Sequence, residues 1–175
     1  CPTKNWVAND SVKNGNIRQL PIKSWYFAPL RYSFPNLIDL FKATKKIYKE
    51  NDKIHIWEYY YPISVVPLLY AFLKGPQKQK KTTLTTDGFV GYSYKPKDPR
   101  WLVPAFKVYT NLIGRILFRI PGKMTTYGNP MIPYAKKAGV PMKKLKVLST
   151  GIHLKKFENI DMNKVKKIQD EFKIK

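Results

Sequence analysis

The stretch Thr85-Thr86-Asp87-Gly88-Phe89 decides the fold that the sequence predicts. β-branched residues from position 82 onward predict a strand that ends at Thr86, and a Gly-Tyr-Ser loop and a long helix follow it. Asp87 then lies at the carboxyl end of a strand, where open α/β sheets hold their ligands. We predict that this acid orients, deprotonates or binds a ligand. The alternative is that it only caps the loop or helix that follows.

Helices and strands alternate on both sides of this stretch. The pattern predicts helices over residues 36–50, 63–73, 98–120 and 130–138, and strands over 53–57, 82–86, 123–126 and 144–149. The run over 63–73 is apolar on all sides, which is typical of a buried helix. This alternation predicts an α/β domain, a mostly parallel sheet with helices on both faces, and therefore three layers.

The two ends of the chain have a different pattern. Residues 1–35 are predicted to be loop around one strand, over 16–20, and residues 161–175 to be a basic amphipathic helix. The first segment interleaves aromatic with basic residues. Its rings either pack on the domain or form a surface that stacks on a ligand. These residues are Trp25, Tyr26, Phe27, Tyr32 and Phe34, with Lys23 and Arg31 between them.

The composition favours one folded domain with anionic partners. The chain has 175 residues, 43% of them hydrophobic, and its 33 Lys and Arg against 11 Asp and Glu give a net charge of +22. Nucleic acid, anionic lipid, pyrophosphate-linked lipid and nucleotide sugars all match this charge. The single cysteine, Cys1, and the two distant histidines, His55 and His153, have no metal-ligand spacing, so we predict neither a metal nor a cofactor.

One helix also has the features of a membrane-surface element. No apolar run reaches the roughly 20 residues that span a bilayer. In the helix over 98–120, however, the apolar face is wider than a core needs, and a narrow polar stripe carries Lys107, Asn111, Gly114, Arg115 and Arg119. Trp101 lies at the start of this helix. The pattern predicts that Trp101, Lys107, Arg115 and Arg119 contact an anionic membrane.

Three motifs together resemble one protein family. Three predicted strands end, in this order, in the motifs His55-Ile56-Trp57-Glu58, Thr85-Thr86-Asp87-Gly88 and Ser149-Thr150-Gly151-Ile152-His153, with Phe157 after the last. Their order and spacing resemble the retaining glycosyltransferases of the GT-B fold, which have two Rossmann-like domains. The departures from the family pattern are Asp87 where the family has an active-site histidine, Trp57 for a second histidine, and Thr150 and His153 for Asn and Asp.

The resemblance implies an acceptor-side domain over residues 1–157, with residues 158–175 as a helix or linker. The first strand and its Gly-rich loop are expected before Cys1, so that the first βα unit is incomplete. The nucleotide-sugar domain is expected after Phe157. The expected catalytic residue is Asp87, and Gly151 and His153 mark the hinge or cleft edge. Acceptor- or sugar-binding residues are His55, Glu58, Tyr59, Gly88, Phe89 and Tyr92.

The resemblance therefore implies transfer of a sugar from a nucleotide-sugar donor to a lipid-linked or glycan acceptor. The donor binds through a domain outside this sequence, so this chain alone is expected to be inactive. The expected location is cytoplasmic, peripheral at the inner face of the membrane. The alternative is a non-catalytic basic module that binds nucleic acid or another polyanion, although no RNA-binding signature, zinc finger or Gly-x-x-Gly clamp supports it.

Overall fold

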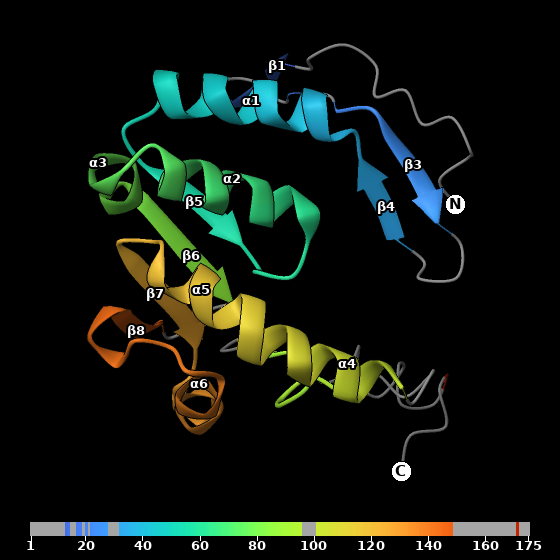
Figure 1. The fold of residues 1–175 in the computed structure, drawn as a ribbon, viewed down its shortest axis with the longest axis vertical. Helices are drawn as coiled ribbons and strands as arrows, with labels where there is room; N and C mark the ends of the chain where they lie inside the picture. Colours follow the sequence, from blue (N-terminus) through green and yellow to red (C-terminus); the bar gives the residue numbers. More distant parts are fainter. Residues whose placement is uncertain are drawn as a thin grey trace.

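A four-stranded parallel sheet forms the centre of the protein (Figure 1). The computed structural model describes residues 13–14, 17–18, 20, 22–27, 32–95, 101–148 and 171. The strands are β5 (Ile54–Trp57), β6 (Thr82–Thr86), β7 (Lys123–Tyr127) and β8 (Leu145–Leu148), and they lie side by side in the order of the sequence. The prediction of an α/β fold with a parallel sheet is confirmed.

Helices make the three connections between these strands. The β5–β6 connection contains α2 (Pro62–Leu73) and α3 (Pro76–Lys80). The β6–β7 connection contains α4 (Leu102–Tyr109), a π-helical turn η2 (Thr110–Gly114) and α5 (Arg115–Arg119). The β7–β8 connection contains η3 (Asn129–Met131), α6 (Ile132–Ala138) and η4 (Met142–Lys144). The sequence predicts the four strands and the helices α2, α4–α5 and α6 to within a few residues, but not α3, η4 or the π-helical turn.

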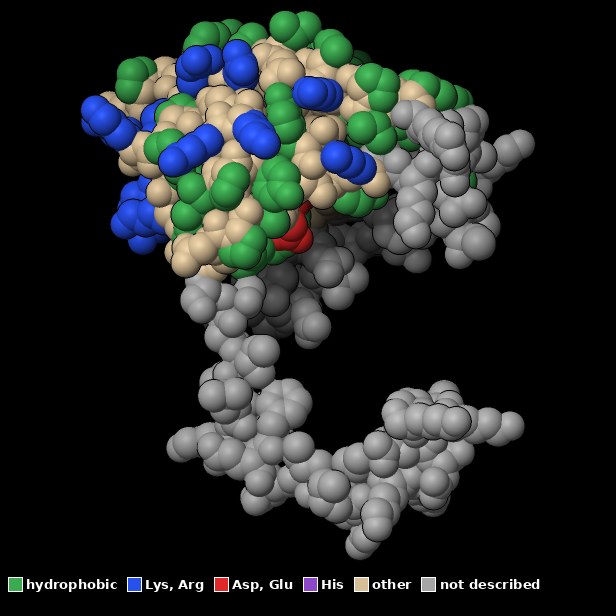
Figure 2. Space-filling view, turned by 90° about the horizontal axis from the view of Figure 1, so that it is seen from below, with side chains coloured by type: hydrophobic (Ala, Val, Ile, Leu, Met, Phe, Trp, Pro, Cys, Tyr) green, Lys and Arg blue, Asp and Glu red, His purple; other side chains and the backbone are tan. Residues whose placement is uncertain are grey.

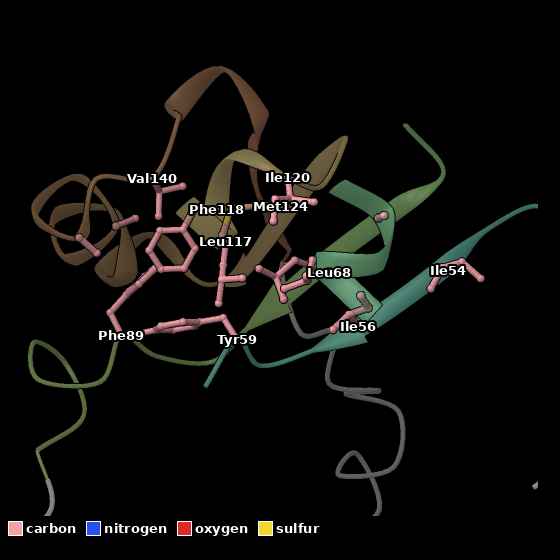
Figure 3. Close-up of a cluster of buried hydrophobic side chains, with 14 of the residues drawn as sticks. Ile54, Ile56, Tyr59, Leu68, Phe89, Leu117, Phe118, Ile120, Met124 and Val140 are labelled. Atoms are coloured by element: carbon pink, nitrogen blue, oxygen red, sulfur yellow. The ribbon is translucent and has the colours of Figure 1, made fainter. Parts of the chain in front are cut away.

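The core lies on one face of the sheet. Ile56, Leu84 and Met124 are buried neighbours on adjacent strands, and Leu68 from α2 and Phe118 from α5 pack in the same cluster (Figure 3). In a sheet whose strand order follows the sequence, crossovers of one hand place every helix on the same side. The described part of the chain therefore has two layers, where the sequence predicts three.

Helix α1 (Leu37–Glu50) extends this helical layer. Its N-cap is Asn36, whose side-chain oxygen accepts hydrogen bonds from the backbone N–H groups of Ile38 and Asp39 at 3.0 and 3.1 Å. Near its other end, the buried Tyr48 hydroxyl lies 2.8 Å from Thr82 Oγ1, at the start of β6. The cap and this contact explain why the helix predicted over 36–50 forms where the sequence places it.

Helix α2 is not buried on all sides, so that prediction is wrong. Leu68 and Ala71 have no exposed surface, whereas Phe72 is 55% and Leu73 74% exposed. The sheet, α1, α3, α5 and β4 all contact α2, but among the described residues its side chains Ile63, Leu69, Phe72 and Leu73 remain exposed. A helix whose residues are all apolar can therefore still expose part of its surface.

The segment before α1 forms hairpins, so the prediction of a loop is wrong there. Strands β3 (Ser24–Phe27) and β4 (Tyr32–Pro35) pair antiparallel, and the Trp25 and Phe34 rings stack across them at 5.1 Å. Trp25 remains 55% exposed, so its ring packs on Phe34 and leaves about half of its surface in solvent, while Phe34 is half-buried on a strand that contacts α2. A second pair joins β1 (Lys13–Asn14) to β2 (Ile17–Arg18), which falls within the strand predicted over 16–20.

Candidate functional site

The ends of β5 and β6 are joined by one buried carboxylate, that of Glu58. Thr86 Oγ1 lies 2.6 Å from Glu58 Oε2, and the Asp87 backbone N–H donates to Glu58 Oε1 at 2.8 Å. The Glu58 backbone N–H donates in turn to the Thr85 carbonyl at 2.8 Å. These three bonds fix the backbone from which the Asp87 side chain extends.

The backbone of Glu58 adopts a conformation that side chains rarely tolerate. Its φ is +59°, and it is the one non-glycine residue among those described with a positive φ. It is also the one charged side chain among them that is buried, with 4% of its surface exposed. Strain of this kind persists where surrounding contacts hold it and is common at functional sites. Here the contacts to Thr86 and Asp87 hold it.

Burial raises the pKa of the Glu58 carboxyl above its usual value. The hydrogen bonds from Thr86 and from the Asp87 backbone oppose this shift, and the charge of Asp87 adds to it. Thr86 Oγ1 also lies 2.7 Å from the Gly88 carbonyl oxygen. A hydroxyl has one hydrogen, so it cannot donate to both acceptors at once. A protonated Glu58 can donate to Thr86, which leaves Thr86 free to donate to Gly88.

Asp87 presents its carboxylate at the surface, unlike Glu58. The residue is exposed, and its backbone N–H is held by Glu58 Oε1. An exposed carboxylate on a fixed backbone can accept a hydrogen bond from a substrate hydroxyl or take its proton. The structure thus places Asp87 where a ligand can reach it, at the carboxyl end of β6.

The loop that follows Asp87 is attached to the helical layer. The Val90 N–H donates to the Tyr59 hydroxyl at 3.0 Å, and the Thr110 hydroxyl donates to the Val90 carbonyl at 2.8 Å. At Gly91, with a φ of +83°, an added Cβ would lie 2.5 Å from the Lys107 backbone nitrogen. The loop and the α4–η2 segment therefore form one packed unit, and only glycine permits so close an approach.

The predicted acceptor-binding residues separate into several environments. Tyr59 and Phe89 have no exposed surface and belong to the core, where a ligand cannot reach them. Glu58 is also buried, and its carboxylate is used by Thr86 and Asp87, so it positions the loop. Gly88 and Tyr92 are half-buried, and the Tyr92 hydroxyl donates to Asn111 Oδ1 at 2.8 Å. The predicted cleft-edge residues Gly151 and His153 lie outside the described residues.

The His55 side chain points to the face of the sheet opposite the core residues, where it contacts Thr85, two residues before Asp87. Its Nε2 lies 2.5 Å from Thr85 Oγ1, which lies 2.5 Å from Thr125 Oγ1. On the same face, the Trp57 and Tyr127 rings approach to 5.7 Å, and Trp57 is 47% exposed. Lys123 and Lys146 are exposed on this face as well. Its surface is therefore aromatic and basic.

The predicted membrane-surface residues are all exposed: Trp101, Lys107, Arg115 and Arg119. The polar stripe is only partly exposed, because Gly114 is buried and Asn111 is half-buried against Tyr92. Asn111 contacts the loop after β6 through Tyr92, and Gly114 faces Tyr59 and Phe118. Apolar side chains take their place at the surface, among them Leu112 and Ile116.

Sequence reasoning missed the residues that hold the site together. Thr86 and Thr110 are buried polar residues whose hydroxyls bond to the loop after β6. Both lie in apolar or β-branched runs, where threonine is ordinary. Only the buried carboxylate beside Thr86 and the π-helical turn at Thr110 distinguish them, and neither can be seen in the sequence.

No group of three or more His, Cys, Asp or Glu side chains in the described ranges is placed to hold a metal ion. Nor does any helix within those ranges have the length and apolar character needed to cross a membrane. Comparison of the chain with protein-family models, with curated proteins and with solved structures gives no match.

Proposed function

We propose that this chain is the acceptor-side domain of a retaining glycosyltransferase that moves a sugar from a nucleotide-sugar donor to a lipid-linked or glycan acceptor. One observation carries the proposal: the exposed Asp87 stands at the carboxyl end of β6, on a backbone that the buried Glu58 fixes. In open α/β sheets the ligand lies beyond the carboxyl ends of the strands. The order of the three motifs along the chain supports the same proposal.

Each group has a role in the proposed reaction. Asp87 accepts a hydrogen bond from the acceptor hydroxyl and orients it toward the sugar donor, which a second domain holds. Glu58 positions Asp87 through its backbone N–H and through Thr86. The half-buried Tyr92, bonded to Asn111, forms one wall beside the acceptor. A fixed carboxylate of this kind contributes through orientation and proton transfer.

The test needs the protein that contains both domains. Purified protein is incubated with a panel of labelled nucleotide sugars and with lipid and glycan acceptors, and transfer of label is followed. Asp87→Asn is expected to lower kcat by about 10²-fold or more, the usual contribution of a positioned acid or base. Asp39→Asn, on α1, serves as a control with the same change of charge. Absence of transfer, or equal rates for Asp87→Asn and wild type, overturns the proposal.

A second candidate function rests on the sheet face that carries Trp57 and Tyr127. An exposed tryptophan and a half-buried tyrosine on a face that also exposes Lys123 and Lys146 form a combination with which proteins bind single-stranded nucleic acid. On this hypothesis the chain is a non-catalytic polyanion-binding module. Trp57→Ala is then expected to weaken binding of a labelled single-stranded RNA by tenfold or more, while Asp87→Asn leaves it unchanged. Sugar transfer by the wild type rules this candidate out as the main function.

A further inference from the structure

The α4–η2–α5 segment exposes a row of apolar side chains. Trp101, Val108, Leu112 and Ile116 are 62%, 57%, 64% and 55% exposed, and Ile113 beside them is 46% exposed. Their spacing of seven, four and four residues places the first four along one side of the helix. Single exposed apolar residues are ordinary, but a contiguous row of large ones marks an interaction site.

The charge around this row has one sign. Residues 101–148 contain nine Lys and Arg and no Asp or Glu. Lys107, Arg115 and Arg119 are exposed on the segment itself. Figure 2, which shows the molecule from below, has basic side chains spread among hydrophobic ones, and acidic side chains at one place only. A partner for this surface must therefore be both anionic and able to take up apolar side chains.

We propose that the α4–η2–α5 segment docks on an anionic lipid bilayer and lies in its plane, with Leu112, Ile113 and Ile116 entering the boundary between headgroups and acyl chains. The basic residues contact the lipid phosphates, and Trp101 lies at headgroup depth, where tryptophan is favoured. The segment from Leu102 to Arg119 is about 27 Å long at 1.5 Å per residue. Its three charges and Pro104 keep it in the plane of the membrane rather than across it.

A bilayer fits this surface better than nucleic acid does. Phosphodiester backbones contact basic and polar side chains, and a row of leucine and isoleucine side chains gains nothing from them. In a bilayer the same side chains leave water while the lysines and arginines remain at the phosphates. This chemistry favours a bilayer with anionic headgroups.

Docking also places the candidate site at the membrane. The Gly91 backbone packs on the backbone of Lys107, and the Thr110 hydroxyl donates to the Val90 carbonyl. The loop that carries Asp87 thus moves with the docked helix. Docking is independent of the proposed sugar transfer, because it requires only the exposed row and its charges. If the sugar-transfer proposal also holds, the acceptor reaches Asp87 from the lipid surface.

Vesicle sedimentation tests the proposal. The purified chain is mixed with vesicles of phosphatidylcholine alone or with vesicles of phosphatidylcholine that contain roughly 30% phosphatidylglycerol, so that the two differ in surface charge. The double variant Leu112→Ser/Ile116→Ser is expected to lower partitioning to anionic vesicles about tenfold or more. The matched control is Leu69→Ser/Leu73→Ser on α2, which is also exposed and is expected to bind as the wild type does.

The depth of Trp101 gives a second readout that does not depend on variants that fold poorly. Brominated acyl chains are expected to quench the tryptophan fluorescence of vesicle-bound protein, and Trp101→Phe is expected to remove most of that quenching. Three results overturn the proposal: equal losses in the α2 control and in Leu112→Ser/Ile116→Ser, quenching unchanged in Trp101→Phe, or strong binding to single-stranded RNA at physiological salt with none to anionic vesicles. If the two-domain protein transfers sugar but does not bind vesicles, the docking proposal is overturned and the sugar-transfer proposal stands.

Discussion

Glu58 and Thr86 share a single hydrogen bond whose direction depends on the proton of the carboxyl. Their oxygens are 2.6 Å apart, and the Thr86 oxygen is also 2.7 Å from the Gly88 carbonyl. When Glu58 is ionised, the Thr86 hydroxyl donates either to the Glu58 carboxylate or to the Gly88 carbonyl, and the other acceptor lacks this hydrogen bond. When Glu58 is protonated, both bonds form. The raised pKa of Glu58 is consistent with this arrangement.

This pair predicts a pH dependence of stability. The pKa of Glu58 is higher in the folded protein than in the unfolded chain, so the folded state binds the proton more tightly. The resulting stabilisation is complete below the usual carboxyl pKa, about 4.3, and is lost as the pH rises through the raised folded value. We expect Glu58→Gln, which cannot ionise, to gain stability relative to wild type between pH 4.5 and 7.5. Urea unfolding followed by tryptophan fluorescence measures the difference, and a constant difference across this range contradicts the prediction.

Removing the carboxyl altogether has the opposite effect. In Glu58→Gln the amide N–H can donate to Thr86, and the amide oxygen can accept from the Asp87 N–H. In Glu58→Ala the Asp87 N–H loses its partner and Thr86 keeps only the bond to the Gly88 carbonyl, while the strained φ of +59° remains. We expect a loss of about 1–3 kcal/mol at pH 5 for alanine. If alanine and glutamine are equally stable there, the two hydrogen bonds contribute nothing.

Gly91 is the position where the loop after β6 depends most on the absence of a side chain. In Gly91→Ala the new Cβ would lie 2.5 Å from the Lys107 nitrogen and 2.9 Å from the Phe106 carbonyl carbon, and the φ of +83° adds strain. We expect a total loss of about 2–6 kcal/mol from strain and overpacking. The control is Gly75→Ala, which has a φ of +87° and no neighbour within 4 Å. It is expected to lose about 1–3 kcal/mol, from strain alone. Equal losses mean that the close packing on α4 is not required.

The Tyr59 hydroxyl joins the loop to the π-helical turn from within the core. It lies 2.7 Å from Thr110 Oγ1 and accepts from the Val90 N–H, and burial raises its pKa, so it stays protonated. Tyr59→Phe leaves the Val90 N–H without a partner, and we expect a loss of about 1–3 kcal/mol and faster hydrogen exchange at Val90. Tyr92→Phe, whose hydroxyl is only half-buried, is expected to lose less, since water can replace that bond. The reverse order contradicts this account.

Periodicity predicted the sheet and its helices because the buried positions of those elements repeat at the spacing of a strand or a helix. Ile54 and Ile56 alternate with His55 and Trp57, and Leu40, Thr44 and Tyr48 recur every four residues. The hairpin β3–β4 was missed because aromatic pairing across two short strands stabilises it, and the sequence shows only frequent turn residues.

The candidate site was predicted in position but not in arrangement. Asp87 follows a strand, and the sequence shows this directly. The Glu58 side chain points inward because its backbone is left-handed, and contacts from β6 stabilise that conformation. The sequence around Glu58 has no pattern that predicts this conformation. His55 was grouped with Asp87 because both belong to strand-end motifs. Side chains alternate between the faces of a strand, which places His55 on the face opposite the core, and its ring contacts Thr85, two residues before Asp87.

The charge of Asp87 links the site to the titration of its buried neighbour. This charge contributes to the raised pKa of Glu58, although less than burial does. Asp87→Asn removes the charge and keeps the backbone N–H that donates to Glu58, so the fold is expected to remain intact. We therefore expect the pKa of Glu58 to fall, toward its usual value, in Asp87→Asn. Carbon-detected NMR of the side-chain carboxyl measures it, and Asp39→Asn on α1 serves as the control. A Glu58 titration that is the same in all three proteins shows that Asp87 does not act on Glu58, and that the two acids at this edge are independent.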